Sequence, residues 1–217
     1  MPRDAKLVIQ VSRWDALKDH LGVLECFANH LDEPNLHLAL AGPAPGAIAD
    51  DPEAAAVLDR LVEAWQGLTD DQRGRAHLIV LPMNDLDENG TMVNALQRRA
   101  DVIVQKSVAE GFGLTVAEGM WKARPVVASR VGGIQDQIVD GESGVLIDDP
   151  ADLEGFGRAI HELLADSTRA ERIGKAAHRR IVDEFLGVSR LRDYVELLAG
   201  LDGIGPRPES LGATRPS

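Results

Sequence analysis

Cysteine, aromatic residues and long apolar runs are all scarce in this sequence. Its 217 residues include one cysteine, Cys26, so no internal disulfide can form, and this usage fits a reducing cytosol. Neither a signal peptide nor an apolar run long enough to span a bilayer is visible. Cys26 falls with Val23 and Phe27 on the apolar face of a predicted helix, where we expect it to pack in a core. The sequence therefore predicts a cytoplasmic protein with no membrane partner.

Basic residues are outnumbered as well. The chain has 23 Lys and Arg against 35 Asp and Glu, a net charge of -12, whereas a nucleic acid or an anionic membrane requires a basic face. The six histidines lack the spacing of metal ligands, and the cluster of Asp85, Asp87 and Glu88 lacks the spacing of a calcium loop. We therefore expect no metal site and no nucleic-acid partner.

Short apolar runs alternate with helical segments along most of the chain. Strands are expected at 6–11, 35–41, 76–81, 102–105, 125–128 and 144–147. Helices are expected at 20–31, 53–66, 88–99, 114–122, 134–139, 152–164, 169–185 and 188–198. This alternation predicts an α/β fold, a Rossmann-like parallel six-stranded sheet flanked by helices. Residues 1–200 should form one domain, and the Gly- and Pro-containing stretch 201–217 a flexible tail.

A glycine-containing turn follows the fourth predicted strand and leads into a helix near Leu114. Gly111 and Gly113 lie in this turn, a geometry that presents backbone N–H groups and the helix dipole to an anion. Glu110 and Glu118 bracket the turn, and their carboxylates can accept hydrogen bonds from sugar hydroxyls. The turn therefore indicates a nucleoside-diphosphate sugar, although an isolated pair of glutamates is more often a loop charge and an exposed helix charge.

Two cations follow the first predicted strand. Arg13 and Lys18 belong to the edge of the sheet where ligands bind, because the carboxyl ends of parallel strands meet there. They could neutralise a diphosphate, or they could be solvated loop charges beside Asp15 and Asp19. The sequence after this strand, Ser-Arg-Trp-Asp, contains no glycine, which argues against a dinucleotide fingerprint and hence a dehydrogenase.

Glu110 and Glu118, with seven residues between them around Gly-Phe-Gly-Leu-Thr, resemble the E-x7-E motif of retaining GT-B glycosyltransferases of group 4. The flanking sequence narrows the resemblance to glycosyltransferring trehalose synthases and trehalose phosphorylases. Three segments are similar to these enzymes: Gln105-Lys-Ser-Val-Ala-Glu-Gly-Phe-Gly-Leu-Thr-Val, Trp121-Lys122 and Val131-Gly-Gly-Ile-Gln-Asp-Gln137. It extends from about Val8 to about Leu198. It covers the C-terminal, donor-binding domain of such a GT-B enzyme.

The resemblance implies roles for individual residues. Arg13 and Lys18 would stabilise the leaving diphosphate, and Glu110 would lie by the sugar hydroxyls near the reaction centre; these three are the expected catalytic residues. Glu118 would accept hydrogen bonds from the ribose hydroxyls. The remaining expected donor-binding residues are Lys106, Gly111, Phe112, Gly113, Leu114 and Thr115. The amides of the last three would cover the diphosphate, whereas Phe112 is either a wall of the sugar pocket or part of the core.

The expected function is the donor half of a retaining hexosyltransferase. It would transfer glucose from a nucleoside-diphosphate glucose, its donor substrate, to glucose and form trehalose, without a cofactor. The N-terminal acceptor domain is absent from this sequence and is the expected partner, so the isolated chain should bind nucleotide without catalysing transfer; a homodimer of the full-length enzyme is left open. A trehalose phosphorylase, another group-4 hexosyltransferase and a non-catalytic nucleotide-binding module are the alternatives. Selection of the base is expected to depend on backbone groups near Val80 to Asn84.

Overall fold

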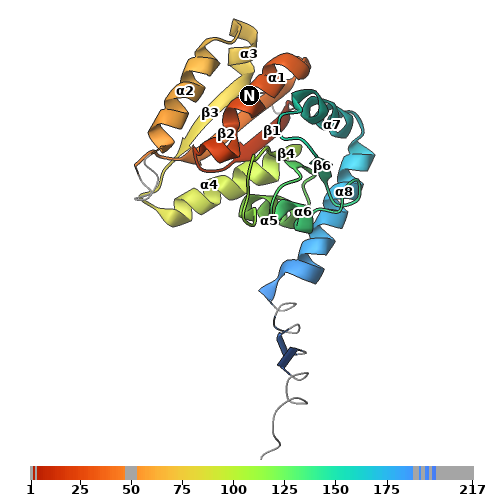
Figure 1. Ribbon diagram of the computed structural model, residues 1–217. Coiled ribbons are helices and arrows are strands. Elements are labelled where there is room, and N and C mark those ends of the chain that lie inside the picture. The colour runs from red at the N-terminus through yellow and green to blue at the C-terminus, as the bar shows by residue number, and fades with distance from the viewer. Residues whose placement is uncertain are drawn as a thin grey trace, which may run out of the picture. The chain divides into compact units, whose positions relative to one another are not determined.

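The computed structural model describes residues 4–46 and 53–187, together with Pro2, Leu191, Tyr194, Val195, Leu197 and Leu198. The chain divides into two compact units, Met1–Ile181 and Val182–Ser217. The strands described all belong to the first unit (Figure 1). The predicted tail at 201–217 and much of the predicted helix at 188–198 lie outside the described residues, so the expected domain limits stay a prediction.

The first unit is built on a six-stranded parallel sheet, as the sequence predicts. Its order is β3-β2-β1-β4-β5-β6, and every neighbouring pair is parallel. The strands are β1 (Lys6–Val11), β2 (Leu36–Pro43), β3 (Ala76–Leu81), β4 (Val102–Gln105), β5 (Val126–Ser129) and β6 (Val145–Ile147).

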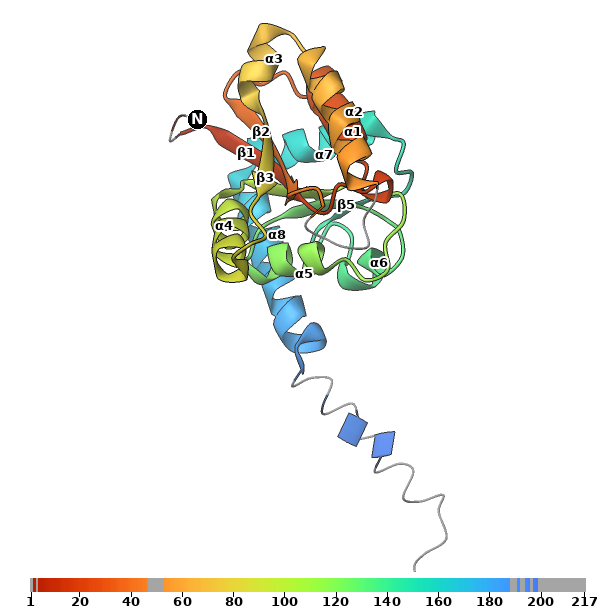
Figure 2. The ribbon, with the colours of Figure 1, turned by 90° about the vertical axis from the view of Figure 1, so that its left-hand side faces the viewer.

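Helices cover both faces of this sheet because each parallel connection must cross over it. They are α1 (His20–His30), α2 (Ala54–Gln66), α3 (Asp70–Arg75), α4 (Leu86–Arg99), α5 (Leu114–Trp121), α6 (Ile134–Gln137), α7 (Leu153–Ala165) and α8 (Ser167–Arg180), with a 3-10 turn η1 (Ala16–Lys18) and a π-helical turn η2 (Ile181–Phe185). Helices α1 and α7 pack together on one face, and α4 and α5 lie on the other (Figures 1 and 2).

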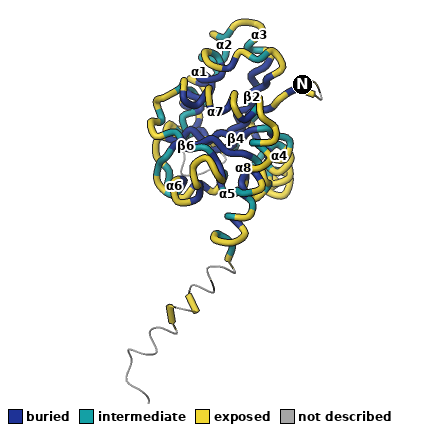
Figure 3. The backbone as a smooth tube through the Cα atoms, turned by 90° about the vertical axis from the view of Figure 1, so that its right-hand side faces the viewer, coloured by how far each residue is buried: buried dark blue, intermediate teal, exposed yellow. Residues whose placement is uncertain are grey.

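The central strands form the core. All residues of β1 after Lys6 are buried, and so are those of β2 as far as Gly42 (Figure 3). Strands that are buried on both faces carry nearly continuous apolar runs, which is why these two are readable in the sequence. Phe27 on α1 and Phe156 on α7 close the core on the helical side, each about 1% exposed.

Local capping accounts for the elements that the sequence analysis does not predict. A loop is expected after β1, but this segment contains η1, whose first turn is capped by the Asp15 side chain accepting from the Leu17 N–H at 2.8 Å. Helix α3 is also unexpected, although Thr69 and Gln72 form a capping box that the spacing T-x-x-Q signals. The helix expected at 169–185 is α-helical only as far as Arg180.

Trp14 anchors the segment that follows β1. The sequence predicts a loop position for this residue, yet its side chain is fully buried and its Nε1–H donates to the Pro43 carbonyl at 2.7 Å. Gly42 leaves the room for the indole, because a Cβ at that position would lie 2.6 Å from Trp14 Cε2. The chain on either side of Trp14, which carries Arg13, is thereby held against the end of β2.

The strand order places two chain segments side by side at the ligand-binding edge. The chain runs outward from β1 through β2 to β3, and then returns to form β4 on the other side of β1. Ligands of open parallel sheets bind at such a reversal, outside the carboxyl ends of the strands. The residues that follow β1 and β4 therefore meet at one place, as expected from chain order.

Candidate functional site

A cavity of about 360 Å³ opens at the carboxyl ends of β1 and β4. It brings together residues that are about 100 positions apart in the sequence, including all three predicted catalytic residues. Its lining consists of Ser12, Arg13, Lys18, Glu110, Phe112, Gly113, Leu114 and Thr115.

The two cations of this cavity are held by carboxylates. Lys18 Nζ lies 2.5 Å from Glu110 Oε2, and both side chains are mostly buried, 14% and 12% exposed. Arg13 is half-exposed and its guanidinium contacts Asp15 at 2.9 Å. The interpretation of Lys18 as a solvated loop charge is therefore wrong. The cavity is therefore lined by two cations, each of which is paired with a carboxylate.

Helix α5 begins at the same cavity. Its N-cap is Gly113, with φ of 87°, a left-handed conformation that glycine adopts without strain. The first N–H groups of a helix have no partner within it, and here no side chain caps them. Thr115 is oriented by donating from Oγ1 to Gln105 Oε1 at 2.8 Å. The cavity thus combines two cations with a helix N-terminus, the arrangement that binds phosphate groups.

Gly132 and Gly133 pack against the turn that carries Glu110. The Gly133 N–H donates to the Gly111 carbonyl at 3.0 Å, and Gln137 Nε2 donates to the Phe112 carbonyl. A Cβ at Gly132 would lie 1.6 Å from the Glu110 carbonyl oxygen. The sequence analysis predicts a turn here at the ligand-binding edge of the sheet, but it does not predict that the Gly-Gly pair packs against the turn that carries Glu110.

A second cavity, of about 330 Å³, lies between α4 and α5. Glu118 lines it, and its Oε2 accepts from the buried Gln97 Nε2 at 2.9 Å. Thr115 lines both cavities, so the two are neighbours. Burial lowers the pKa of Lys122, while the carboxylate of Glu118 opposes that shift. The full lining is Val11, Asn89, Gly90, Val93, Asn94, Thr115, Glu118 and Lys122.

Helix α4 contributes to this second cavity, which the sequence analysis does not predict. Asn89 and Val93 are four residues apart, as are Gly90 and Asn94, so these two pairs form one broad face of the helix. Asn89 also donates from Nδ2 to the Pro82 carbonyl at 2.9 Å. It therefore connects the cavity with the segment Val80 to Asn84, where selection of the base is expected.

Other predicted donor-binding residues differ in accessibility. Phe112 is 44% exposed, so the interpretation that it packs in the core is wrong, and it forms a wall of the first cavity. Gly111 accepts from Gly133 and has open space where a Cβ would be. Lys106 is buried, and its Nζ pairs with Asp19. Donor contact by Lys106 stays a prediction.

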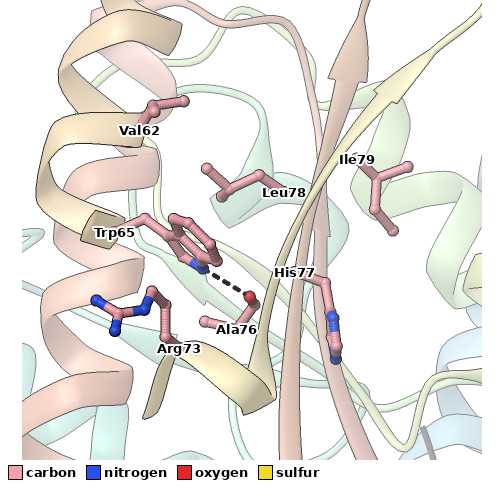
Figure 4. A pocket seen from close by; sticks show the side chains of 7 residues that line it. All are labelled: Val62, Trp65, Arg73, Ala76, His77, Leu78 and Ile79. Atoms are coloured by element: carbon pink, nitrogen blue, oxygen red, sulfur yellow. Dashed lines mark hydrogen bonds between the residues drawn. The ribbon is translucent and has the colours of Figure 1, made fainter. Parts of the chain in front are cut away.

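A larger hollow, about 580 Å³, lies at the edge of the sheet along the first part of β3 (Figure 4). Trp65 fills one side of it and donates from Nε1 to the Ala76 carbonyl at 2.8 Å. Arg73 lies over the Trp65 ring, 6.0 Å from its centre. Because this hollow borders the amino half of β3, away from the carboxyl ends of the strands, we do not assign the function to it.

Neither a membrane span nor a metal cluster is found in the part of the chain that the structure describes. No helix there has the length and apolar character needed to cross a membrane. The same residues contain no cluster of three or more His, Cys, Asp and Glu side chains that could hold a metal ion.

The fold and the two cavities define a class of protein. Residues 1–180 match the family described as Glycosyl transferases group 1, and the chain belongs to this family. Among solved structures, it is similar to sucrose-phosphate synthase from Thermosynechococcus elongatus, with 26% identity and a TM-score of 0.73 over 94% of this chain and 47% of the other. The parallel sheet is thus the Rossmann-like sheet seen in GT-B glycosyltransferases.

The curated relatives are more specific. The trehalose synthase of Rubrobacter xylanophilus is 39% identical over 198 residues, which cover 91% of this chain and 44% of that protein. A trehalose phosphorylase of Pleurotus pulmonarius is 28% identical over 82% of this chain and 24% of the relative. The chain therefore spans less than half the length of the curated relatives it matches.

Proposed function

We propose that this chain is the donor-binding half of a retaining hexosyltransferase that forms trehalose from a nucleoside-diphosphate glucose and glucose. The observation that carries the proposal is the convergence of Arg13, Lys18, Glu110 and the start of α5 on one cavity. The relatives named trehalose synthase support the choice of product.

The two neighbouring cavities suit the two ends of such a donor. The first, with its cations and helix N-terminus, suits the diphosphate and the sugar. The second, with Glu118 held by Gln97, suits the ribose, whose hydroxyls can donate to the carboxylate. We assign the nucleoside to the space between α4 and α5.

Bond cleavage transfers negative charge to the departing diphosphate. Arg13 and Lys18 would stabilise this charge, which is greatest when the glycosidic bond has broken. To reach the phosphate oxygens, Arg13 would leave Asp15, whereas Lys18 would keep Glu110 and donate its remaining hydrogen bonds to the ligand. In a retaining transfer, the acceptor hydroxyl must approach on the face from which the diphosphate departs.

We propose that the acceptor is held by surface outside this chain, because the relatives are more than twice as long as the matched region. The chain alone would then bind nucleotide without forming trehalose. A trehalose phosphorylase is the second candidate, favoured by the weaker similarity to proteins of that name. Formation of trehalose by the purified chain from nucleoside-diphosphate glucose and glucose would contradict the proposal that the acceptor is held outside this chain.

The decisive test is calorimetric titration of ADP, UDP and GDP into the chain. We expect one of them to bind with micromolar to millimolar affinity. Arg13→Ala and Glu118→Ala should each weaken binding by about tenfold to a hundredfold, since a hydrogen bond to a charged group contributes ~1.5–3 kcal/mol.

Matched controls are available on the helices. Arg158→Ala and Glu162→Ala remove exposed charges of α7, which pair with Glu154 and Arg169. Both should leave affinity unchanged. If none of the three nucleotides binds, or if the controls lose as much affinity as the site variants, the proposed function is wrong for this chain.

A further inference from the structure

We infer that Lys106 is a positioning residue for Lys18, acting through the buried Lys106–Asp19 ion pair, rather than a contact of the donor. The inference rests on the proposed function, because Lys18 matters only if the first cavity binds the diphosphate. Its geometric part concerns the chain alone and can be tested without any ligand.

Burial decides against a direct role in binding. The Lys106 side chain is 3% exposed, its Nζ pairs with Asp19 Oδ2, and it lies 5.8 Å from the centre of the Phe156 ring. A buried ammonium is stable only with a close partner, since its desolvation costs several kcal/mol. Asp19 is that partner, and so little surface of Lys106 remains for a ligand.

Asp19 connects this ion pair with the segment after β1 that carries Lys18. It directly follows Lys18 and has φ of 48°, a left-handed conformation that only glycine, Asn and Asp adopt routinely. Its Oδ1 caps α1 by accepting from the Gly22 N–H at 3.0 Å. A Cβ at Gly22 would lie 2.5 Å from Lys106 Nζ, so the pair fills the space beside this glycine.

The backbone around Lys106 connects the same two segments again. The Lys106 N–H donates to Gln10 Oε1 at 3.0 Å, and Gln10 Nε2 donates to the Lys18 carbonyl at 2.7 Å. The Val108 N–H donates to the Leu17 carbonyl at 2.8 Å. Together with the ion pair, these bonds fix the segment after β1 against the segment after β4. They thereby set the position of the Lys18 ammonium relative to Glu110.

Lys106→Met tests the ion pair because it removes the ammonium group and keeps an unbranched side chain only one atom shorter. It leaves the Asp19 carboxylate without its buried partner, so the carboxylate turns toward solvent or toward the neighbouring Lys18 ammonium. Either movement disturbs the left-handed turn and the Lys18–Glu110 contact. Adding Asp19→Asn removes the uncompensated charge, and Asn still caps the helix and tolerates the left-handed conformation.

The experiment measures amide hydrogen exchange and nucleotide affinity on the full chain. In Lys106→Met we expect exchange at the Val108 and Gly22 N–H groups to rise about tenfold, because their partners are local to this turn. We expect the affinity for whichever of ADP, UDP and GDP the unaltered chain binds to fall about fivefold or more, since Lys18 loses its orientation. The double variant Lys106→Met with Asp19→Asn should recover most of the protection from exchange and most of the nucleotide affinity. Lys175→Met, at an exposed lysine of α8 paired with Glu171, is the control.

Each outcome decides a separate claim. Unchanged exchange in Lys106→Met would overturn the positioning role, whatever the nucleotide does. Faster exchange with unchanged affinity would show that the turn is held but does not serve binding, which also overturns the inference. Failure of Asp19→Asn to rescue affinity would favour direct contact between Lys106 and the donor. If the unaltered chain binds no nucleotide, the proposed function fails, and the exchange data alone decide whether Lys106 positions the turn.

Discussion

Gly132 offers a sharp test of how the turn that carries Glu110 is held in place. Its φ is 48°, and a Cβ there would lie 1.6 Å from the carbonyl oxygen and 2.8 Å from the carbonyl carbon of Glu110. Both contacts are with backbone, which cannot rotate away as a side chain can. In Gly132→Ala, the turn that carries Glu110 must therefore move.

The magnitude follows from two contributions. A left-handed conformation costs a residue with a Cβ about 1–2 kcal/mol. Overpacking against an ordered neighbour adds about 1–3 kcal/mol. The free energy of unfolding should therefore fall by about 2–5 kcal/mol in Gly132→Ala. Gly141 supplies the control, because its φ is 74° but nothing lies within 4 Å of the position that a Cβ would occupy, so Gly141→Ala should lose about 1–2 kcal/mol only.

Urea unfolding monitored by tryptophan fluorescence compares the two variants, and calorimetry measures nucleotide affinity in each while it is folded. Gly132→Ala should lose both stability and affinity, because Glu110 and the start of α5 share the displaced turn. Gly141→Ala should keep its affinity. Equal losses of stability in the two variants, or normal affinity in Gly132→Ala, would refute the argument that Gly132 positions this turn.

Three further predictions concern buried polar groups. Burial lowers the pKa of His20 from 6.5 to about 4. The imidazole therefore binds a proton more readily in the unfolded chain than in the folded one. As the pH falls from 6.5 toward 4, the free energy of unfolding should decrease by up to roughly 3 kcal/mol. His20→Gln should flatten that part of the pH profile of urea unfolding, and an unchanged slope would contradict the assignment. Burial raises the pKa of Cys26 to about 12, and its thiol donates to the Leu153 carbonyl. Iodoacetamide at about pH 8 should therefore modify Cys26 only in urea; rapid labelling of the folded chain would show an accessible thiol. Gln97→Ala removes the donor to Glu118 and should weaken nucleotide binding about fivefold. An unchanged affinity in calorimetry would mean that Glu118 needs no such orientation.

The sequence determined the sheet because buried parallel strands leave a local signal. Lys6–Val11, Ala76–Leu81 and Val102–Gln105 have the bounds that the sequence predicts, since an apolar run bounded by polar residues is a short-range pattern. The unpredicted elements are short and owe their existence to side-chain caps. The capping box at Thr69 and Gln72 is readable in the sequence, whereas the cap of η1 by Asp15 competes with many similar loop sequences.

Part of the candidate site is also readable from the chain alone. Arg13, Lys18 and Glu110 follow strand ends, and chain order in a parallel sheet brings such residues to one edge. The structure places all three on one cavity. Their roles in binding and transfer stay predictions until a donor is titrated.

Tertiary structure decided what each of these side chains touches. Lys18 pairs with Glu110, 92 residues away, and Lys106 pairs with Asp19, 87 residues away. The exposure of Phe112 decides between the two positions that the sequence leaves open for it, and the burial of Trp14 is not visible in its local sequence. Such pairings depend on which segments the strand order juxtaposes and on the burial that results. Local sequence carries strand and helix periodicity, but the partner of a buried charge is fixed only when distant segments pack together.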